Sequence, residues 1–137
     1  MKKSLALFLS LGIIALAPLA SLAIGGSEVL ISMQTAREKL VALLDTSDKA
    51  MQATLIDSIH KASDEADKKL AAALGDAALT AEVKAKLTEA KSTWEDFKKT
   101  READIIPAVQ AGNAAKGKEL AKTVQADRFK KLVTLLQ

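Results

Sequence analysis

The sequence has no cysteine and no tyrosine, and it has a single histidine and a single tryptophan in 137 residues. Without cysteine, the chain can form no disulfide, no covalent c-type haem attachment and no acylated lipoprotein anchor. With His60 as the one histidine and no glycine-rich phosphate loop, no catalytic triad or metal cluster of recognised spacing can be assembled. We therefore expect a protein that is not an enzyme and that requires no cofactor or metal.

The N-terminal residues are typical of a bacterial export signal. Two lysines precede an uncharged apolar run at residues 5–17. Small residues then predict cleavage after Ala23, which would leave residues 24–137 as one periplasmic domain. A second interpretation keeps this segment as an uncleaved inner-membrane anchor facing the periplasm, because the uncharged stretch is long enough to cross a bilayer. Pro18, Gly25 and Gly26 argue against one unbroken helix there.

The charge balance excludes one class of partner. Removal of residues 1–23 takes away two of the 20 basic residues and none of the 17 acidic ones, so the net charge falls to about +1. No basic stripe with interleaved aromatic residues is present, and nucleic acid is therefore not an expected partner. Few aromatic residues are available, so most of the core must be aliphatic side chains and alanine.

The remaining sequence has the periodicity of α-helices. Apolar residues recur at alternating spacings of four and three, and no stretch shows the period-two alternation of a strand. The pattern predicts four helices at about residues 27–45, 49–74, 80–111 and 114–136. Four helices joined by short links predict an all-α, antiparallel up-down-up-down four-helix bundle.

Polar residues, proline and glycine mark the expected helix ends. Residues 45–48 offer N-caps for the second helix, and Thr80 is the expected N-cap of the third. Pro107 should kink or loosen the last turns of the third helix, because it lacks a backbone donor and clashes with the preceding turn. Gly112 and Asn113 then form the corner into the fourth helix.

The expected core is the apolar seam of each helix. Its members are Met33, Leu40, Leu55, Ile59, Leu87, Trp94, Phe97, Ile105, Leu120, Val124 and Leu132. Alanine at many seam positions allows close helix approach but offers less apolar area than leucine. We therefore expect either modest stability or a core that is completed by homodimerisation.

The three arginines are candidate ligand-binding residues. Arg37, Arg101 and Arg128 all fall within apolar sectors of their helices, and Arg101 occupies a seam position where another apolar residue is due. A guanidinium group there suits recognition of a carboxylate, because it donates in a planar, bidentate fork. The alternative is that these arginines pair with neighbouring carboxylates and extend towards solvent.

Met33 and His60 suggest a further hypothesis, because a small exported bundle can hold haem through methionine and histidine ligands. His60 lies at the flank of the second helix's seam, and Met33 lies on the seam of the first. Packing of Met33 in the core and a partly exposed His60 are the simpler interpretation. A b-type haem-binding electron carrier is retained as an alternative.

Three stretches resemble the periplasmic four-helix-bundle sensor domain of methyl-accepting chemotaxis receptors. They are SMQTAREKLVALLDT, LTEAKSTWEDFKKTREADIIPAVQAGN and AAKGKELAKTVQADRFKKLVTLL, and the resemblance covers residues 33–136. In that family an aromatic residue, a long apolar stretch and a Gly-Asp or Gly-Asn corner lead into the last helix. Trp94, the isoleucine pair at residues 105–106 and the Gly112-Asn113 corner match this order.

The resemblance implies a sensor module without the family's second membrane span and signalling modules, because the sequence ends at Gln137. It implies dimerisation and small ligands bound near arginines of the first helix, of which Arg37 matches by position. The leading hypothesis is therefore a signalling protein that binds a small carboxylate-bearing solute or a partner helical protein such as a membrane receptor. A structural or chaperone-like periplasmic interaction protein is the alternative.

Overall fold

The computed structural model describes the backbone of residues 17–137 and the side chains of residues 25–137, and this part contains helices but no strand. Most of the expected export signal, residues 1–16, lies outside the described part. The helices are α1 (Ala17–Leu44), α2 (Lys49–Leu74), α3 (Ala81–Thr100), the π-helix η1 (Arg101–Ile105), α4 (Ile106–Gln110), α5 (Ala114–Lys122) and α6 (Val124–Leu136).

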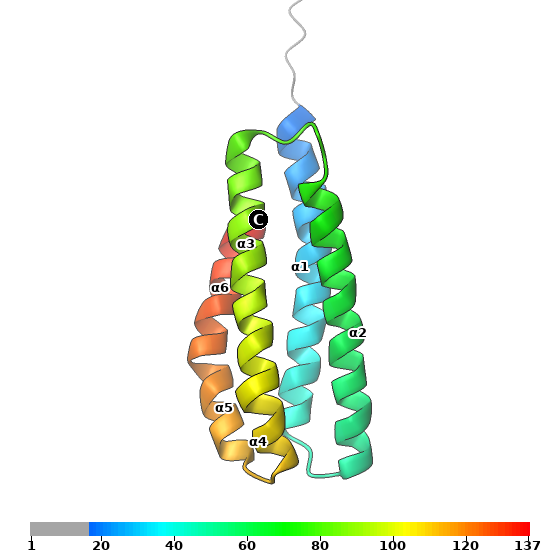
Figure 1. The fold of residues 1–137 in the computed structure, drawn as a ribbon, viewed down its shortest axis with the longest axis vertical. Helices are drawn as coiled ribbons and strands as arrows, with labels where there is room; N and C mark the ends of the chain where they lie inside the picture. Colours follow the sequence, from blue (N-terminus) through cyan, green and yellow to red (C-terminus); the bar gives the residue numbers. More distant parts are fainter. Residues whose placement is uncertain (1–16) are drawn as a thin grey trace, which may run out of the picture.

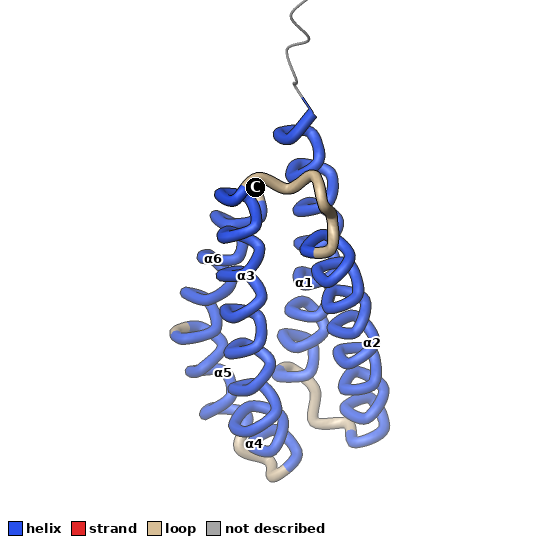
Figure 2. Tube along the Cα trace, turned by 45° about the horizontal axis from the view of Figure 1, so that its top comes forward, coloured by secondary structure: helices blue, strands red, loops and turns tan. Residues whose placement is uncertain are grey.

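These elements form four rods of an antiparallel bundle, as the sequence predicts (Figure 1). The third rod is α3, η1 and α4 in succession, and the fourth is α5 followed by α6. Around the bundle the order is α1, α2, α3 and α6, with α6 returning to α1. The closest packing is within the pairs α1–α2 and α3–α6, which Figure 2 shows as two neighbouring layers.

The predicted helix caps are confirmed. Asp48 accepts a hydrogen bond from the backbone N–H of Met51 at 2.7 Å, and Thr80 accepts one from Val83 at 3.2 Å. Each bond satisfies a donor that the first helical turn leaves without a partner. At the last corner, Gly112 has a φ of 81°, a conformation that glycine adopts without strain.

The expectation that Gly25 and Gly26 interrupt the first helix is wrong. The helix α1 runs through both glycines without a break. A helical glycine costs only about 1 kcal/mol relative to alanine, so it weakens a helix without ending it. Packing explains why residue 26 is a glycine, because a Cβ atom there would lie 2.5 Å from the backbone oxygen of Leu136. The glycine lets α1 approach the end of α6.

Gly26→Ala is expected to lower the free energy of unfolding by about 1–3 kcal/mol, because a backbone carbonyl cannot rotate away as a side chain can. Gly25→Ala is the matched control, since its Cβ would meet the nearest atom, on Ala73, at an ordinary 4.0 Å. The control should be neutral or stabilising by up to about 1 kcal/mol. Chemical denaturation followed by circular dichroism measures both, and equal effects would contradict the close contact.

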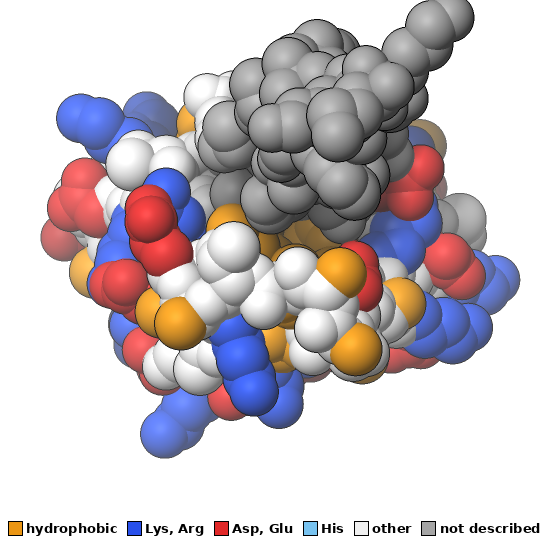
Figure 3. Space-filling view, turned by 90° about the horizontal axis from the view of Figure 1, so that it is seen from above, with side chains coloured by type: hydrophobic (Ala, Val, Ile, Leu, Met, Phe, Trp, Pro, Cys, Tyr) orange, Lys and Arg blue, Asp and Glu red, His pale blue; other side chains and the backbone are white. Residues whose placement is uncertain are grey.

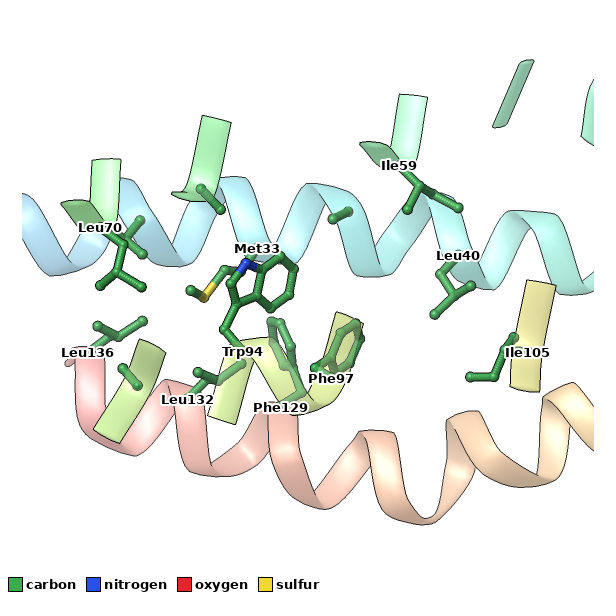
Figure 4. Close-up of a cluster of buried hydrophobic side chains, with 14 of the residues drawn as sticks. Met33, Leu40, Ile59, Leu70, Trp94, Phe97, Ile105, Phe129, Leu132 and Leu136 are labelled. Atoms are coloured by element: carbon green, nitrogen blue, oxygen red, sulfur yellow. The ribbon is translucent and has the colours of Figure 1, made fainter. Parts of the chain in front are cut away.

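The core contains an aromatic cluster within an aliphatic surround (Figure 4). Trp94 and Phe97 are fully buried and stack with their ring centroids 5.3 Å apart, and Phe129 adds a tilted ring 6.4 Å from Phe97. Met33 lies beside the indole of Trp94. Side chains from three of the four rods, α1, α3 and α6, thus meet in this cluster.

The expectation that Val124 packs in the core is wrong, because this side chain is 41% exposed. The fourth rod breaks at Thr123, whose φ of −108° and ψ of −96° are not helical. After the break, the buried face of α6 is Gln125, Phe129, Leu132 and Leu136. Leu120, like Leu55 in α2, is partly buried against the core. Because Gln125 is polar, the apolar periodicity of the sequence does not indicate that the buried face of α6 passes through it.

The predicted loosening near Pro107 takes the form of a π-helical turn. In η1 the backbone N–H of Ile106 donates to the carbonyl of Arg101, five residues earlier. Pro107 has no N–H, and its ring would crowd the carbonyl of Ala103 in an α-helix. The wider π turn relieves that contact, and it turns Arg101 and Ile105 into the core.

Candidate functional site

Arg37 lies in a groove between α1 and α5, at the end of the bundle that holds the α1–α2 and α4–α5 corners (Figure 1). The cavity volume is about 440 Å³. Its lining residues, which define the α1–α5 groove, are Arg37, Val41, Leu44 and Asp45 of α1 and its corner, Lys118, Ala121 and Lys122 of α5, and Ala126 of α6. Helical periodicity explains this set, because residues three and four apart share one face.

The groove is electropositive. It contains three cations, Arg37, Lys118 and Lys122, against the single carboxylate of Asp45. Asp45 pairs with Lys118 at 3.0 Å across the two elements. Arg37 and Lys122 make no hydrogen bond or ion pair with any residue that the structure describes. Two cations of the groove are therefore available to an anion.

Phe129 holds the guanidinium group of Arg37 in place. The Cζ atom of Arg37 lies 4.8 Å from the centroid of the Phe129 ring, in a cation–π contact. Such a contact orients the planar group without using its N–H donors. Val41, Leu44, Ala121 and Ala126 supply apolar surface around it. The groove thus combines a positioned cation with an apolar lining, as small-molecule sites commonly do.

Arg101 does not line this groove. Its side chain is 2% exposed, and it donates from Nη1 to Ser63 Oγ on α2 and from Nε to Glu102 Oε1, both at 2.8 Å. Glu102 in turn lies 3.1 Å from His60 Nε2. We name these four residues the Arg101 cluster. These contacts join α2 to η1, and they commit Nε and Nη1 of the buried Arg101 to other residues of the bundle.

Arg128 forms hydrogen bonds that join two rods of the bundle. Its Nη1 atom donates to the backbone oxygen of Asp96 at 3.1 Å, to Thr100 Oγ1 at 2.6 Å and to Gln125 Oε1 at 3.1 Å. Gln125, fully buried, donates to the backbone oxygen of Phe97 at 2.9 Å. These bonds fasten α6 to the end of α3. The three arginines proposed as one set of ligand-binding residues therefore lie in three different environments.

The suggested haem ligands do not form a pair. Met33 is fully buried in the core, whereas the side chain of His60 is 47% exposed and contacts Glu102 on the surface. Axial ligands must face one another across a single pocket. Within the described residues, no group of three or more histidine, cysteine or acidic side chains has a metal-binding arrangement.

A second groove lies between α2 and α3, with a volume of about 320 Å³. Its charged residues are already paired: Asp67 accepts from Trp94 Nε1 at 2.9 Å and from Lys98, and Lys91 lies 3.8 Å from Glu95. Its apolar floor is Leu70, Ala71 and Leu74. This groove has no uncommitted cation comparable with Arg37, and the α1–α5 groove is the better candidate site.

Sequence reasoning identified Arg37 but missed Lys118 and Lys122. The two lysines are four residues apart, which places them on one face of α5. Nothing in the sequence indicates that this face lies opposite Arg37, since that depends on how the fourth rod packs against the first. Asp45, which the sequence offers as part of a capping segment, instead pairs with Lys118 at the groove.

Figure 3 views the molecule from the end opposite the α1–α5 groove, where the residues that the structure does not describe cover part of the surface. Among the described residues visible in this view, acidic and basic side chains are interspersed around the sides. Within residues 17–137, no helix has both the length and the apolar character needed to cross a membrane.

Comparison with known protein families shows a match over most of the chain. The family described as a four helix bundle sensory module for signal transduction, which occurs in methyl-accepting chemotaxis proteins, matches residues 26–137. Comparisons with curated proteins and with solved structures gave no match. The matched region includes most of α1, the other three rods and the whole α1–α5 groove. The chain therefore belongs to the family of four-helix-bundle sensory modules for signal transduction.

Proposed function

We propose that this protein is a non-enzymatic sensor that binds a small carboxylate-bearing solute in the α1–α5 groove and acts in signalling or chemotaxis. The observation that carries the proposal is the uncommitted guanidinium group of Arg37, which lies over Phe129 and lines a groove with two lysines. Family membership supports the sensory role, and the groove supplies the place and the chemistry.

A carboxylate fits this groove better than a cation or a neutral polar solute does. The guanidinium group donates in a planar fork that matches the two oxygens of a carboxylate, and Lys122 adds a second positive charge. The volume of about 440 Å³ lies within the range of about 300–1,000 Å³ that small-molecule sites occupy. The apolar lining favours a carboxylate that carries a hydrocarbon or aromatic body.

The periplasm is the proposed compartment. In chemoreceptors this module lies outside the cytoplasm, and residues 1–23 have the composition of an export signal. A sensor in the periplasm would meet small organic acids that enter from outside the cell.

A thermal-shift screen of amino acids, organic acids and aromatic carboxylates tests the proposal. At a concentration 100 times its Kd, a ligand that binds the folded state alone stabilises that state by about 2.7 kcal/mol. We expect Arg37→Ala to abolish the shift given by the best carboxylate. Lys116→Ala, which changes an exposed lysine of α5 outside the groove, should retain it. A shift that survives Arg37→Ala would place the ligand elsewhere, and no shift with any carboxylate would refute the proposal.

A further inference from the structure

The helix α5 is a short rigid segment between two breaks. It begins after the corner at Gly112 and Asn113, and it ends at the non-helical Thr123. Beyond Thr123, α6 is fastened to α3 by Gln125 and Arg128. A force on α5 can therefore be absorbed by rotation at these two breaks, while α6 stays in place.

One face of α5 lines the α1–α5 groove and the adjacent face contacts η1. Lys118, Ala121 and Lys122 belong to the groove. Gly117, next to Lys118, is buried, and a Cβ atom there would lie 2.8 Å from Leu44 Cδ2 and 3.4 Å from Ile105 Cγ2. The backbone of α5 thus touches a groove residue and a π-helical residue at the same point, with no side chain of its own between them.

The π-helical turn η1 is an irregular element inside an otherwise α-helical rod. It holds one more residue than an α-helical turn of the same rise, and π turns of this kind are frequent at functional sites. Arg101 and Ile105, at its two ends, are both buried, so a change of helical register must move side chains in the core. Closely packed interiors pass such displacements on rather than dissipate them.

We propose that α5 couples the α1–α5 groove to η1 through the contact at Gly117, so that an anion bound in the groove stabilises the π-helical turn. The proposal rests on the proposed function for its ligand, but the mechanical contact exists without one. The anion attracts Lys122 and Arg37 from opposite walls and so holds α5 against α1, which also holds Gly117 against Ile105. The stability of the π-helical turn in the third rod would then depend on whether an anion occupies the groove.

Hydrogen exchange of the backbone amides in residues 101–110, followed by mass spectrometry, tests the contact without a ligand. Gly117→Val inserts a side chain between α5 and its two neighbours, and we expect exchange in this segment to quicken by about fivefold or more. Ala115→Val adds a side chain of the same kind at an exposed position of α5 and should leave the segment unchanged. Equal exchange in the two variants would overturn the proposal.

The folded state of each variant is checked in the same experiment by exchange in residues 59–70 of α2. If Gly117→Val fails to fold, Gly117→Ala replaces it, because the smaller group meets most closely the flexible end of Leu44. Exchange in residues 101–110 should still quicken relative to Ala115→Val, by a smaller factor. No difference between these two would equally overturn the proposal.

Benzoate, a carboxylate with an apolar body, provides the ligand experiment on the unchanged protein. Binding is established separately by calorimetry, and exchange in residues 101–110 is expected to slow by about fivefold at saturation. If benzoate binds and this segment is unaffected, the coupling is refuted while the proposed function stands. If benzoate and other carboxylates fail to bind but Gly117→Val still quickens exchange, the contact at Gly117 is supported and the proposed function is the part that fails.

Discussion

Trp94→Ala is expected to lower the free energy of unfolding by about 3–5 kcal/mol, as truncation of a large buried aromatic side chain does. Trp94 is fully buried, stacks on Phe97 and donates from Nε1 to Asp67 at 2.9 Å. Alanine would remove the stacked ring and leave a cavity at the point where three rods meet. Urea denaturation followed by far-UV circular dichroism measures the change.

Met51→Ala is the control, because Met51 is a large apolar side chain that is 55% exposed, and its truncation should cost less than about 0.5 kcal/mol. If Trp94→Ala does not fold, Trp94→Phe keeps an aromatic ring and removes the bond to Asp67. That variant should lose about 1–3 kcal/mol. A loss below about 1 kcal/mol for Trp94→Ala would contradict the assignment of Trp94 to the centre of the core.

Glu102→Ala is the second large effect, and it is unexpected for a side chain that is 44% exposed. The guanidinium group of Arg101 is buried, and Glu102 is the carboxylate that it contacts. Removing that carboxylate leaves a buried positive charge that retains Ser63 as a hydrogen-bond partner. Breaking a fully buried pair costs about 3–5 kcal/mol. Because solvent screens the half-exposed carboxylate of Glu102, we expect a smaller loss of about 1–2 kcal/mol.

Arg101→Met separates the charge from the packing. Methionine fills a similar volume, and replacing a buried charge by an apolar side chain is often neutral or stabilising. We expect Arg101→Met to change stability by less than about 1 kcal/mol and to remove most of the cost of Glu102→Ala in the double variant. Glu95→Ala, which breaks an exposed pair with Lys91 at 3.8 Å, should cost about 0.5 kcal/mol or less. Equal losses for Glu102→Ala and Glu95→Ala would contradict the buried charge.

The Arg101 cluster also shows how far sequence reasoning reaches. Periodicity indicates that Arg101 lies on a seam among apolar neighbours, and the structure places it there. The sequence does not reveal that Ser63, another buried polar residue, lies opposite it on α2. That pairing depends on the relative register of two rods, which short-range patterns do not encode. A charged residue at an apolar seam position can be recognised within one helix, but its partner can be recognised only in the packed bundle.

In the fourth rod, the apolar periodicity of the sequence predicts the wrong buried face. Its apolar residues suggest a seam through Val124, yet the break at Thr123 shifts the buried face to Gln125 and Phe129. No proline or glycine marks this break, and the tie from Gln125 to Phe97 is a tertiary contact. The α1–α5 groove escapes prediction for the same reason, because its lysines look like an ordinary solvated face until α5 lies beside α1.

Isothermal titration calorimetry of the carboxylate that gives the largest thermal shift tests the central claim most directly. The titration is made with the unchanged protein, with Arg37→Ala and with Lys116→Ala. A guanidinium–carboxylate contact is worth about 1.5–3 kcal/mol, so we predict that Arg37→Ala weakens binding by about tenfold or more, while Lys116→Ala binds as the unchanged protein does. If no tested carboxylate binds, the α1–α5 groove is not the sensory site. The same conclusion follows if a carboxylate binds and Arg37→Ala leaves its affinity unaltered.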